Sequence, residues 1–326
     1  MARLLDEGSA LDAAVAILSS GGLVAIPTET VYGLAADAAN GAAVARIFEA
    51  KGRPRFNPLI AHVADREMAD SLASFDALSS RLADAFWPGP LTLVLPRRRN
   101  APVHPLVSAE LDTLALRIPR GFGGELIARL GRAIAAPSAN SSGRVSTTTA
   151  RAVQRDLGNK VDLIVDGGPT SVGVESTIVK IAGGRLHLLR PGGIAAAELE
   201  AVAGVPVERG GSGGVDAPGQ LASHYAPNAA VRLDVAEVRP GEALLAFGPL
   251  RARGADAAAA LRNLSPSGDL REAAANLFTL LHELDGSNAP VIAVEPIPAH
   301  GLGEAINDRL RRAAAPRHIP VVNERA

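Results

Sequence analysis

Residues 23–33, LVAIPTETVYG, contain the first of several short apolar runs that end in a polar segment. Leu23–Ile26 has the length and the composition of a buried strand, and Pro27 closes it. A helix is predicted just before this strand, with Ser9 as its N-cap and Gly21 at its end. Its apolar residues recur at helical spacing: Leu11, Val15 and Leu18. A helix followed directly by a buried strand favours an α/β fold.

The same alternation continues along the chain. Further strands are predicted at 59–63, 91–95, 114–118, 133–136, 161–165, 177–181 and 186–189, and helices at 41–51, 76–86, 122–131 and 147–157. The strands between 161 and 190 follow one another closely, which favours a mixed sheet over a purely doubly wound one. We therefore expect a twisted mixed sheet covered by helices.

A change of composition divides the chain. The stretch ERGGSGGVDAPGQ at 208–220 is rich in glycine and has no hydrophobic periodicity, which is typical of a flexible linker. A second alternation follows, with strands predicted at 231–235, 243–247 and 291–294 and helices at 269–285 and 303–314. The predicted division is a first domain at 1–208, a linker at 209–229 that acts as a lid, and a small Rossmann-like α/β domain at 230–326.

Composition limits the function classes. The chain has 326 residues, of which 47% are apolar and 21% charged, so it can bury a core of about two domains. A net charge of −1 lacks the basic excess of a nucleic-acid-binding protein, although it leaves room for a local basic surface. Without cysteine, the chain has no disulfide, no thiolate metal site and no cysteine nucleophile, which is consistent with a reducing cytosol.

The N-terminal segment also bears on location. Asp6, Glu7 and Asp12 interrupt its apolar stretch, so we expect an amphipathic helix rather than a signal peptide. No run approaches the roughly 18 apolar residues of a membrane span. We expect a soluble, cytoplasmic protein without a membrane partner.

A basic cluster at 51–58, KGRPRFNP, follows the helix predicted at 41–51. Lys51 and Arg53 would complement the dipole of that helix at its C-terminus, which is a common arrangement. Alternatively they form a phosphate clamp, in which Arg53 supplies a planar fork and Lys51 a point charge. Two prolines stiffen the loop that presents Asn57, which favours a binding site over a surface turn.

A second polar cluster at 138–143, SANSSG, ends the strand predicted at 133–136. Thr147–Thr149 then precede a helix, and a helix N-terminus with free amides and hydroxyls is an anion site. Simple N-capping would need only one of these residues. Segments 27–33, 173–177 and 190–193 also place hydroxyls or an arginine at strand ends, which caps alone do not readily explain.

Arg117 lies within an otherwise apolar strand, where an unpaired guanidinium would be costly. Its partner is either a structural carboxylate or the carboxylate of a substrate. His62 also lies beside apolar residues, where a single histidine is more often a satisfied core residue than a catalyst. The other six histidines have no metal-ligand spacing, so no dedicated metal site is predicted.

Together these segments resemble the threonylcarbamoyl-AMP synthase family, in its two-domain form with an N-terminal YrdC-like domain. The resemblance is carried by PTETVYGLAADA, KGRPRFNPLIAHV, FWPGPLTLVL, LALRIPR, APSANSSG, GVESTIVKI, LLRPGGI and the linker motif Ser223-His224-Tyr225-Ala226-Pro227. NLSPSGDLREAAANLF and GLGEAINDRLRRAA match the family's accessory domain. The Lys-x-Arg and Ser-x-Asn signatures are intact, whereas Gln220-Leu221-Ala222 departs from the more basic and aromatic linker of the family.

The resemblance implies that L-threonine, bicarbonate or CO2 and ATP give threonylcarbamoyl-adenylate and pyrophosphate. Downstream tRNA threonylcarbamoyltransferase proteins then use this product to modify the adenosine next to the anticodon. Position by position, the resemblance assigns L-threonine binding to Thr30, His62, Arg117, Ser138 and Ser176. It assigns ATP binding to Lys51, Arg53, Asn57, Thr113, Asn140, Thr148, Arg190 and Tyr225, with His224 as a secondary candidate beside Tyr225.

No side chain has the setting of a covalent nucleophile. Lys51, Arg53, Ser138 and Asn140 are expected to act by positioning and charge neutralisation. The clustered acidic ligands of a two-metal site are missing from the sequence, so Mg²⁺ is expected to arrive with ATP.

Two other functions stay open at this point. A double-stranded RNA-binding module without synthase activity would use the same cleft arginines, since YrdC-like domains have been associated with such RNA. A carbamoyl-transfer enzyme of the hydrogenase-maturation type contains a related domain. That enzyme type would need additional zinc-binding and acylphosphatase segments, which the sequence lacks.

Overall fold

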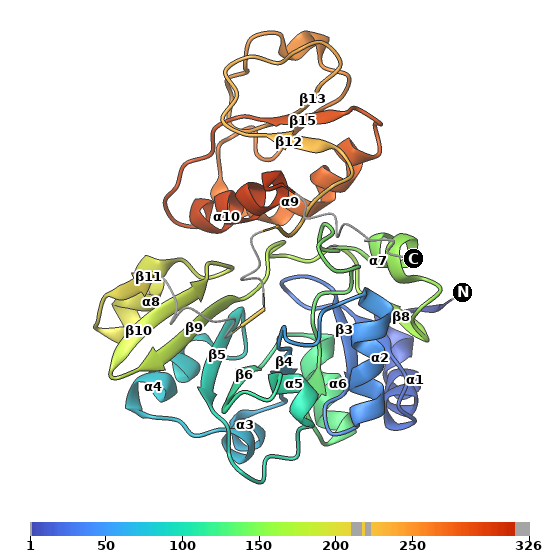
Figure 1. The fold of residues 1–326 in the computed structure, drawn as a ribbon, viewed down its shortest axis with the longest axis vertical. Helices are drawn as coiled ribbons and strands as arrows, with labels where there is room; N and C mark the ends of the chain where they lie inside the picture. The colour runs from blue at the N-terminus through green and yellow to red at the C-terminus, as the bar shows by residue number, and fades with distance from the viewer. Residues whose placement is uncertain (1, 210–216, 219–222, 317–326) are drawn as a thin grey trace, which may run out of the picture.

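The computed structural model describes residues 2–209, 217–218 and 223–316. Over these ranges the chain forms two α/β units (Figure 1). The larger domain contains an 11-stranded sheet, and the smaller unit, which we call the accessory domain, contains a 4-stranded sheet. The glycine-rich positions 210–216 and 219–222 of the predicted linker lie outside the described residues.

The larger domain alternates strands and helices. Its strands are β1 Arg3–Asp6, β2 Val24–Ile26, β3 Gly33–Asp37, β4 Ile60–His62, β5 Leu91–Pro96, β6 Thr113–Arg117, β7 Ile134–Ala135, β8 Leu163–Asp166, β9 Thr177–Ala182, β10 Arg185–Arg190 and β11 Val207–Arg209. Its helices are α1 Glu7–Ser19, α2 Gly41–Lys51, α3 Arg66–Leu72, α4 Ala77–Phe86, α5 Pro105–Ser108, α6 Phe122–Leu130, α7 Ala150–Leu157 and α8 Ala196–Ala203. The strand order is β1-β8-β2-β3-β7-β4-β6-β5-β9-β10-β11. The expected mixed sheet is confirmed, because β5 is antiparallel to β6 and parallel to β9.

Alternate residues of each strand face opposite sides of this sheet, as the period of two requires. In β2, Ala25 belongs to the main core with α2, whereas Val24 and Ile26 pack with α1 and α6. In the middle of the sheet, Ala61 of β4 and Leu116 of β6 face the main core. Their neighbours along β4 and β6 therefore face the other side, where the pocket described below lies.

The accessory domain is a parallel α/β unit. Its elements are β12 Ala230–Arg232, β13 Ala243–Ala246, η1 Ala255–Ala257, β14 Leu261–Asn263, α9 Leu270–Asp285, β15 Val291–Val294 and α10 Gly303–Ala314. The order β12-β15-β13-β14, with parallel neighbours throughout, matches the Rossmann-like expectation. Helices α9 and α10 lie between this sheet and the larger domain (Figure 1).

The two domains approach each other at the level of the backbone. Gly173 has a φ of 77°, and a Cβ there would lie 2.3 Å from the carbonyl oxygen of Ala274 in α9. Thr148 Oγ1 lies 2.8 Å from Thr279 Oγ1, also in α9. Glycine at 173 is therefore required by this contact as well as by its dihedral angle.

Two local predictions are wrong. Helix α1 begins at Glu7 with Asp6 as its N-cap, and Ser9 instead donates its hydroxyl to the Asp6 carbonyl within the first turn. The fully buried face of α1 consists of Ala10, Ala14 and Leu18 rather than Leu11 and Val15, because alanine allows close packing against α6. The helix predicted at 147–157 begins later, at Ala150, since Thr149 is its N-cap.

Candidate active site

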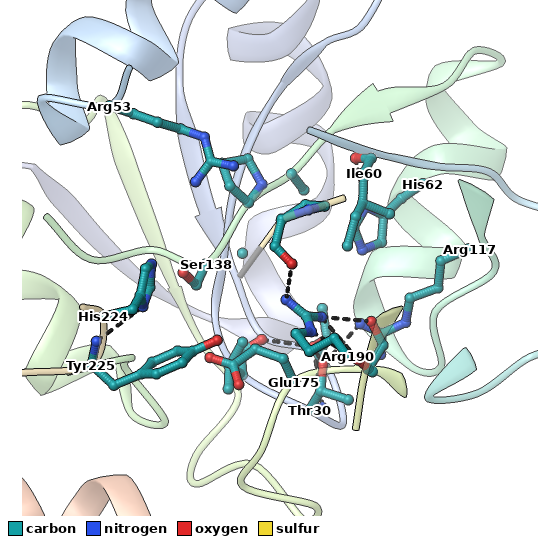
Figure 2. Close-up of a pocket in the computed structure, with 17 residues that line it drawn as sticks. Thr30, Arg53, Ile60, His62, Arg117, Ser138, Glu175, Arg190, His224 and Tyr225 are labelled. Atoms are coloured by element: carbon teal, nitrogen blue, oxygen red, sulfur yellow. Dashed lines mark hydrogen bonds between the residues drawn. The ribbon is translucent and has the colours of Figure 1, made fainter. Parts of the chain in front are cut away.

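A pocket lies at the ends of β4 and β6, on the face opposite the main core (Figure 2). It is lined by Thr28, Thr30, Val31, Gly33, Arg53, Ile60, His62, Arg117, Ala136, Pro137, Ser138, Glu175, Ser176, Arg190, Pro218, His224 and Tyr225. The fold thus brings most of the predicted site residues together, from segments far apart in the chain.

Arg117 and His62 are register partners at the ends of the parallel strands β6 and β4. The Arg117 guanidinium donates to the Gly89 carbonyl at 3.1 Å and to Thr30 Oγ1 at 2.9 Å. Its Nη2 lies 2.8 Å from Glu29 Oε1, so the strand arginine does have a structural carboxylate partner. This ion pair is not aligned as a hydrogen bond, and Nη2 has no hydrogen-bond partner among the described residues. A ligand carboxylate would satisfy it.

His62 is almost fully buried. Burial, together with the charge of Arg117, lowers its pKa to about 3. The imidazole is therefore neutral at physiological pH, and it acts as a hydrogen-bonding group rather than as a charge.

Hydroxyl groups connect this end of the pocket to its centre. Thr30 Oγ1 lies 2.9 Å from Thr28 Oγ1, and Ser176 Oγ lies 2.7 Å from Thr92 Oγ1 on β5. Ser138 forms an isolated bridge with Gly33, which holds the Ser-x-Asn segment against the start of β3. Protein partners thus hold the hydroxyls of Thr30 and Ser176, and the bridge holds the backbone of Ser138.

Arg53 and Arg190 form the basic end of the pocket. Arg53 donates to the carbonyls of Asn57 at 3.2 Å and Pro58 at 2.8 Å. Arg190 donates to the Ser176 carbonyl at 2.9 Å and to the Pro218 carbonyl at 3.4 Å. Burial lowers the pKa of both guanidinium groups, to about 10 for Arg53. Among the described residues, neither arginine forms an ion pair with a carboxylate.

Lys51 is the last residue of α2. Its Nζ donates to the Ser138 carbonyl at 2.6 Å and to the Asn140 carbonyl, so it joins the Lys-x-Arg segment to the Ser-x-Asn segment. Burial, followed by the charge of Arg53, lowers its pKa to about 7. Lys51 lies behind the pocket wall, since it is not among the lining residues.

Four predicted ATP residues are also outside the pocket lining. Both amide atoms of Asn57, and Oδ1 of Asn140, are buried without a hydrogen-bond partner among the described residues. Such groups are costly to bury and point to a missing ligand. Thr113 begins β6 and lies on the same strand face as Arg117, whereas Thr148 is at the domain interface with Thr279.

The threonine hydroxyls before helix α7 all have protein partners. Thr149 caps the Ala152 amide, and Thr147 donates its hydroxyl to the Ala139 carbonyl. Because each hydroxyl already has a protein partner, the threonines stabilise the helix start and the Ser-x-Asn loop.

Sequence reasoning did not assign a role to Glu175. This buried residue lines the pocket and accepts hydrogen bonds from Ser146 Oγ at 2.5 Å and from Arg309 Nε at 2.9 Å. Arg309 lies on the buried face of α10 with Ile306 and Ala313. Its helical spacing from those two residues was a signal that this arginine would be buried.

Two wider searches cover the described residues only. Within them, no group of three or more His, Cys, Asp and Glu side chains is placed to hold a metal ion. No described helix is long and apolar enough to cross a membrane.

The fold and the pocket define an α/β protein in which buried arginines meet hydroxyls at strand ends. Comparison with known proteins gives the family. A family model described as "Telomere recombination" matches residues 16–192, and one described as "Threonylcarbamoyl-AMP synthase, C-terminal domain" matches residues 194–315. The chain belongs to the threonylcarbamoyl-AMP synthase family, which confirms the resemblance seen in the sequence.

Relatives match over nearly the full length. The chain is 41% identical over 330 residues to the threonylcarbamoyl-AMP synthase of Pyrococcus abyssi, covering 94% of this chain and 95% of that protein. It is 40% identical over 325 residues to the Bacillus subtilis protein of the same name, covering 94% and 93%. The crystal structure of P. abyssi Sua5 complexed with L-threonine has a TM-score of 0.86 and 37% identity, covering 96% of this chain and 97% of that chain.

Proposed function

We propose that this chain converts L-threonine, bicarbonate or CO2 and ATP into threonylcarbamoyl-AMP and pyrophosphate. The observation that carries the proposal is the set of buried cations Lys51, Arg53 and Arg190, which among the described residues meet carbonyl and hydroxyl oxygens but no carboxylate. Buried charge of this kind requires an anion. The names of the full-length relatives support the same reaction.

L-threonine occupies the end of the pocket that contains Arg117. Its carboxylate meets Arg117 Nη2, and its polar groups meet the hydroxyls of Thr30, Ser138 and Ser176 beside neutral His62. The fixed hydroxyls and the unsatisfied Nη2 support this placement. The P. abyssi relative was crystallised with the same amino acid.

ATP occupies the basic end. The threonine amine adds to CO2 with loss of a proton, or to bicarbonate with loss of water, and forms a carbamate. The carbamate oxygen then attacks the α-phosphorus and displaces pyrophosphate. Arg53 and Arg190 neutralise the charge that this displacement spreads over the phosphates, and Lys51 fixes the two signature segments. Asn57 and Asn140 offer amide groups that are buried and unsatisfied. The reaction depends on positioning and charge neutralisation rather than on a protein nucleophile.

Mg²⁺ reaches this site as the ATP complex. Glu175 is the one carboxylate in the described pocket lining, and Ser146 and Arg309 already occupy it. The oxygens still without a partner among the described residues include the amide oxygens of Asn57 and Asn140. This donor set fits an ion held mainly by phosphate and water, as Mg²⁺ commonly is in nucleotide sites.

The product is a reactive mixed anhydride, so it needs an acceptor protein. We assign that role to the downstream tRNA threonylcarbamoyltransferase proteins. Direct contact between this chain and RNA is a second possible interaction. The cytoplasm, where tRNA and ATP meet, is the compartment that this role requires.

Pyrophosphate release from ATP by the purified full-length chain tests the function. Release should require both L-threonine and bicarbonate, and the nucleotide product should carry the threonylcarbamoyl group. Leaving out either substrate is the control. No release above those controls would overturn the proposal, and salt-dependent RNA binding by the same inactive protein would then favour an RNA-binding module.

A further inference from the structure

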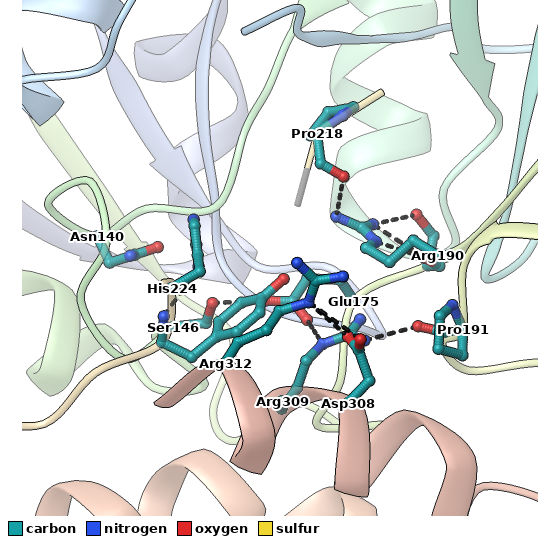
Figure 3. Close-up of polar contacts among 12 residues, drawn as sticks. Asn140, Ser146, Glu175, Arg190, Pro191, Pro218, His224, Asp308, Arg309 and Arg312 are labelled. Carbon is teal, nitrogen blue, oxygen red and sulfur yellow. Dashed lines mark hydrogen bonds and ion pairs between the residues drawn. The ribbon is translucent and has the colours of Figure 1, made fainter. Parts of the chain in front are cut away.

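Helix α10 of the accessory domain places Arg309 directly behind the pocket wall (Figure 3). This side chain is 0% exposed, although it comes from a different domain. Its Nε donates to Glu175 Oε2 at 2.9 Å, and its Nη1 donates to the Pro191 carbonyl at 2.7 Å. The guanidinium carbon also lies 5.2 Å from the centre of the Tyr225 ring, which lines the pocket.

Glu175 is a surprising residue for an anion pocket. A free carboxylate there would repel phosphate, and it would attract the nearby cations that should bind phosphate. Its position is fixed because the 190–193 turn packs directly against it: a Cβ on Gly192 would lie 2.3 Å from the Glu175 carbonyl oxygen. Although burial raises the pKa of Glu175, the charges of Arg309 and Arg190 more than offset this, so the carboxyl stays ionised.

Arg190 is the cation that Glu175 would capture. It donates to the carbonyl of Ser176, the residue next to Glu175 in the chain. With Arg309 in place, both Glu175 oxygens are occupied, one by Ser146 and one by Arg309. Arg190 is then left with carbonyl and hydroxyl partners in the described part of the chain.

The charges of this cluster balance. Arg309 also lies 2.9 Å from Asp308, which pairs with Arg312 one helical turn further on. Glu175, Asp308, Arg309 and Arg312 therefore sum to zero. Removing Arg309 would leave an excess negative charge beside the pocket.

We propose that Arg309 is a positioning residue that the accessory domain supplies to the ATP end of the pocket. It holds and neutralises Glu175, so that Arg190 stays available for the phosphates of ATP. The inference rests on the proposed function, because the triphosphate is the anion that Arg190 receives. It gives the accessory domain a direct part in nucleotide binding.

Four full-length variants test this role: Arg309→Met, Arg309→Lys, the double variant Arg309→Met with Glu175→Gln, and the control Glu304→Gln. Glu304 lies on the same helix and pairs across the domains with Arg209 at 2.7 Å, but it is not part of the pocket or of the Glu175 cluster. Steady-state pyrophosphate release is measured against ATP and against L-threonine. Calorimetric titration with a non-hydrolysable ATP analogue gives nucleotide affinity without turnover.

Arg309→Met should raise the KM for ATP and weaken analogue binding by about tenfold or more, while the KM for L-threonine changes less than about threefold. Neutralising Glu175 in the double variant should recover most of the ATP affinity that Arg309→Met loses. The ATP affinity of Arg309→Lys should lie between those of Arg309→Met and the parent. Glu304→Gln should stay within about twofold of the parent, since exposed ion pairs contribute little. The distinguishing signature is recovery of ATP affinity by Glu175→Gln while the KM for L-threonine stays within about threefold in all variants, because a purely structural loss would affect both substrates.

Equal ATP affinity in the parent and Arg309→Met would overturn the inference, as would a loss that Glu175→Gln fails to recover. If Arg309→Met does not fold, ATP affinity is compared between Arg309→Lys and the double variant. The inference then requires that the double variant bind the ATP analogue at least as well as Arg309→Lys. A parent protein that binds the analogue but releases no pyrophosphate would overturn the proposed function instead. The calorimetric comparison would still decide the role of Arg309 in that case.

Discussion

The two ends of the pocket hold buried arginines in different states. At one end, Arg117 is joined to Glu29, Thr30 and Gly89 within the larger domain. At the other end, Arg190 meets carbonyl and hydroxyl oxygens, while the nearby carboxylate of Glu175 is taken by Arg309 from the accessory domain. The first arrangement fixes the direction of a guanidinium. The second keeps a positive charge free for a ligand.

This difference matches the two substrates assigned to the pocket. A single small carboxylate gains mainly from one well-oriented partner, so a held arginine suits it. A triphosphate carries several charges, so it gains from cations that are not already neutralised by the protein. Each of the following predictions tests one side of this comparison.

Arg117→Met should have the largest effect. It leaves Glu29 buried without its partner, which costs about 3–5 kcal/mol of unfolding free energy, and it removes the proposed threonine contact. Denaturant unfolding and threonine titration measure the two effects separately. In the double variant with Glu29→Met, stability should largely return while threonine binding stays lost. Full recovery of threonine binding in that variant would show that Arg117 is structural only.

Arg53→Ala should affect the opposite substrate. Turnover should fall on the order of 100-fold, because a buried cation that stabilises the phosphates is removed. Threonine affinity should change by less than about threefold. Arg55 lies in the same loop but is exposed, so Arg55→Ala is the matched control. Unchanged ATP affinity in Arg53→Ala, or an equal loss in both variants, would contradict the assignment of this end to ATP.

Gly173→Ala should separate the accessory domain from the pocket and lower turnover by about tenfold. The new Cβ would meet the backbone of α9, so the helix that packs beside α10 has to move. Gly168→Ala is the control, since Gly168 has a similar φ of 74° but open space around its Cβ position. Hydrogen exchange should increase in α9 only in Gly173→Ala, with the larger domain still folded. Equal behaviour of the two variants would mean that backbone strain, not docking, sets the effect.

Much of the fold could be predicted from the sequence, but strands defined by their neighbours could not. The helices at 41–51 and 303–314 are confirmed at both ends, because their apolar spacing is a local signal and Asn40 and Gly52 cap the first of them. Strand β3 was missed, since Gly33–Asp37 consists of one glycine, one leucine, two alanines and one aspartate, without β-branched residues. It is a strand because it pairs with both β2 and β7.

The site shows the same limit. The two signature segments were recognisable from their residues, yet the bonds from Lys51 to the Ser138 and Asn140 carbonyls depend on the folded sheet. Glu175 and Arg309 are 134 residues apart and meet only after two domains dock. Charge pairing over such a distance has no sequence period, so local patterns could show that Arg309 is buried but not which carboxylate it meets.

The smallest effect concerns one proton at Lys51. Its pKa is about 7 instead of 10.5, so at pH 8 about nine-tenths of the amine is neutral by the ordinary titration relation. Bound phosphates favour the charged form and raise this pKa, so ATP binding at pH 8 should take up a fraction of a proton at this amine. Calorimetric titration in buffers with different ionisation enthalpies measures the uptake. At pH 5.5, where the amine is already charged, the uptake at Lys51 should vanish.

Lys51→Met is the control for this proton uptake. The pH dependence of the unfolding free energy independently checks that the pKa of Lys51 is lowered in the folded chain. Between pH 7 and about 10.5 the unfolded chain holds the lysine proton and the folded chain does not. The contribution of Lys51 to the unfolding free energy therefore rises with pH across this window, and its burial penalty is fully present below pH 7. Replacement by methionine should flatten that rise. Equal proton uptake in the parent and in Lys51→Met would place the proton elsewhere, and the basic end would then act through arginines alone.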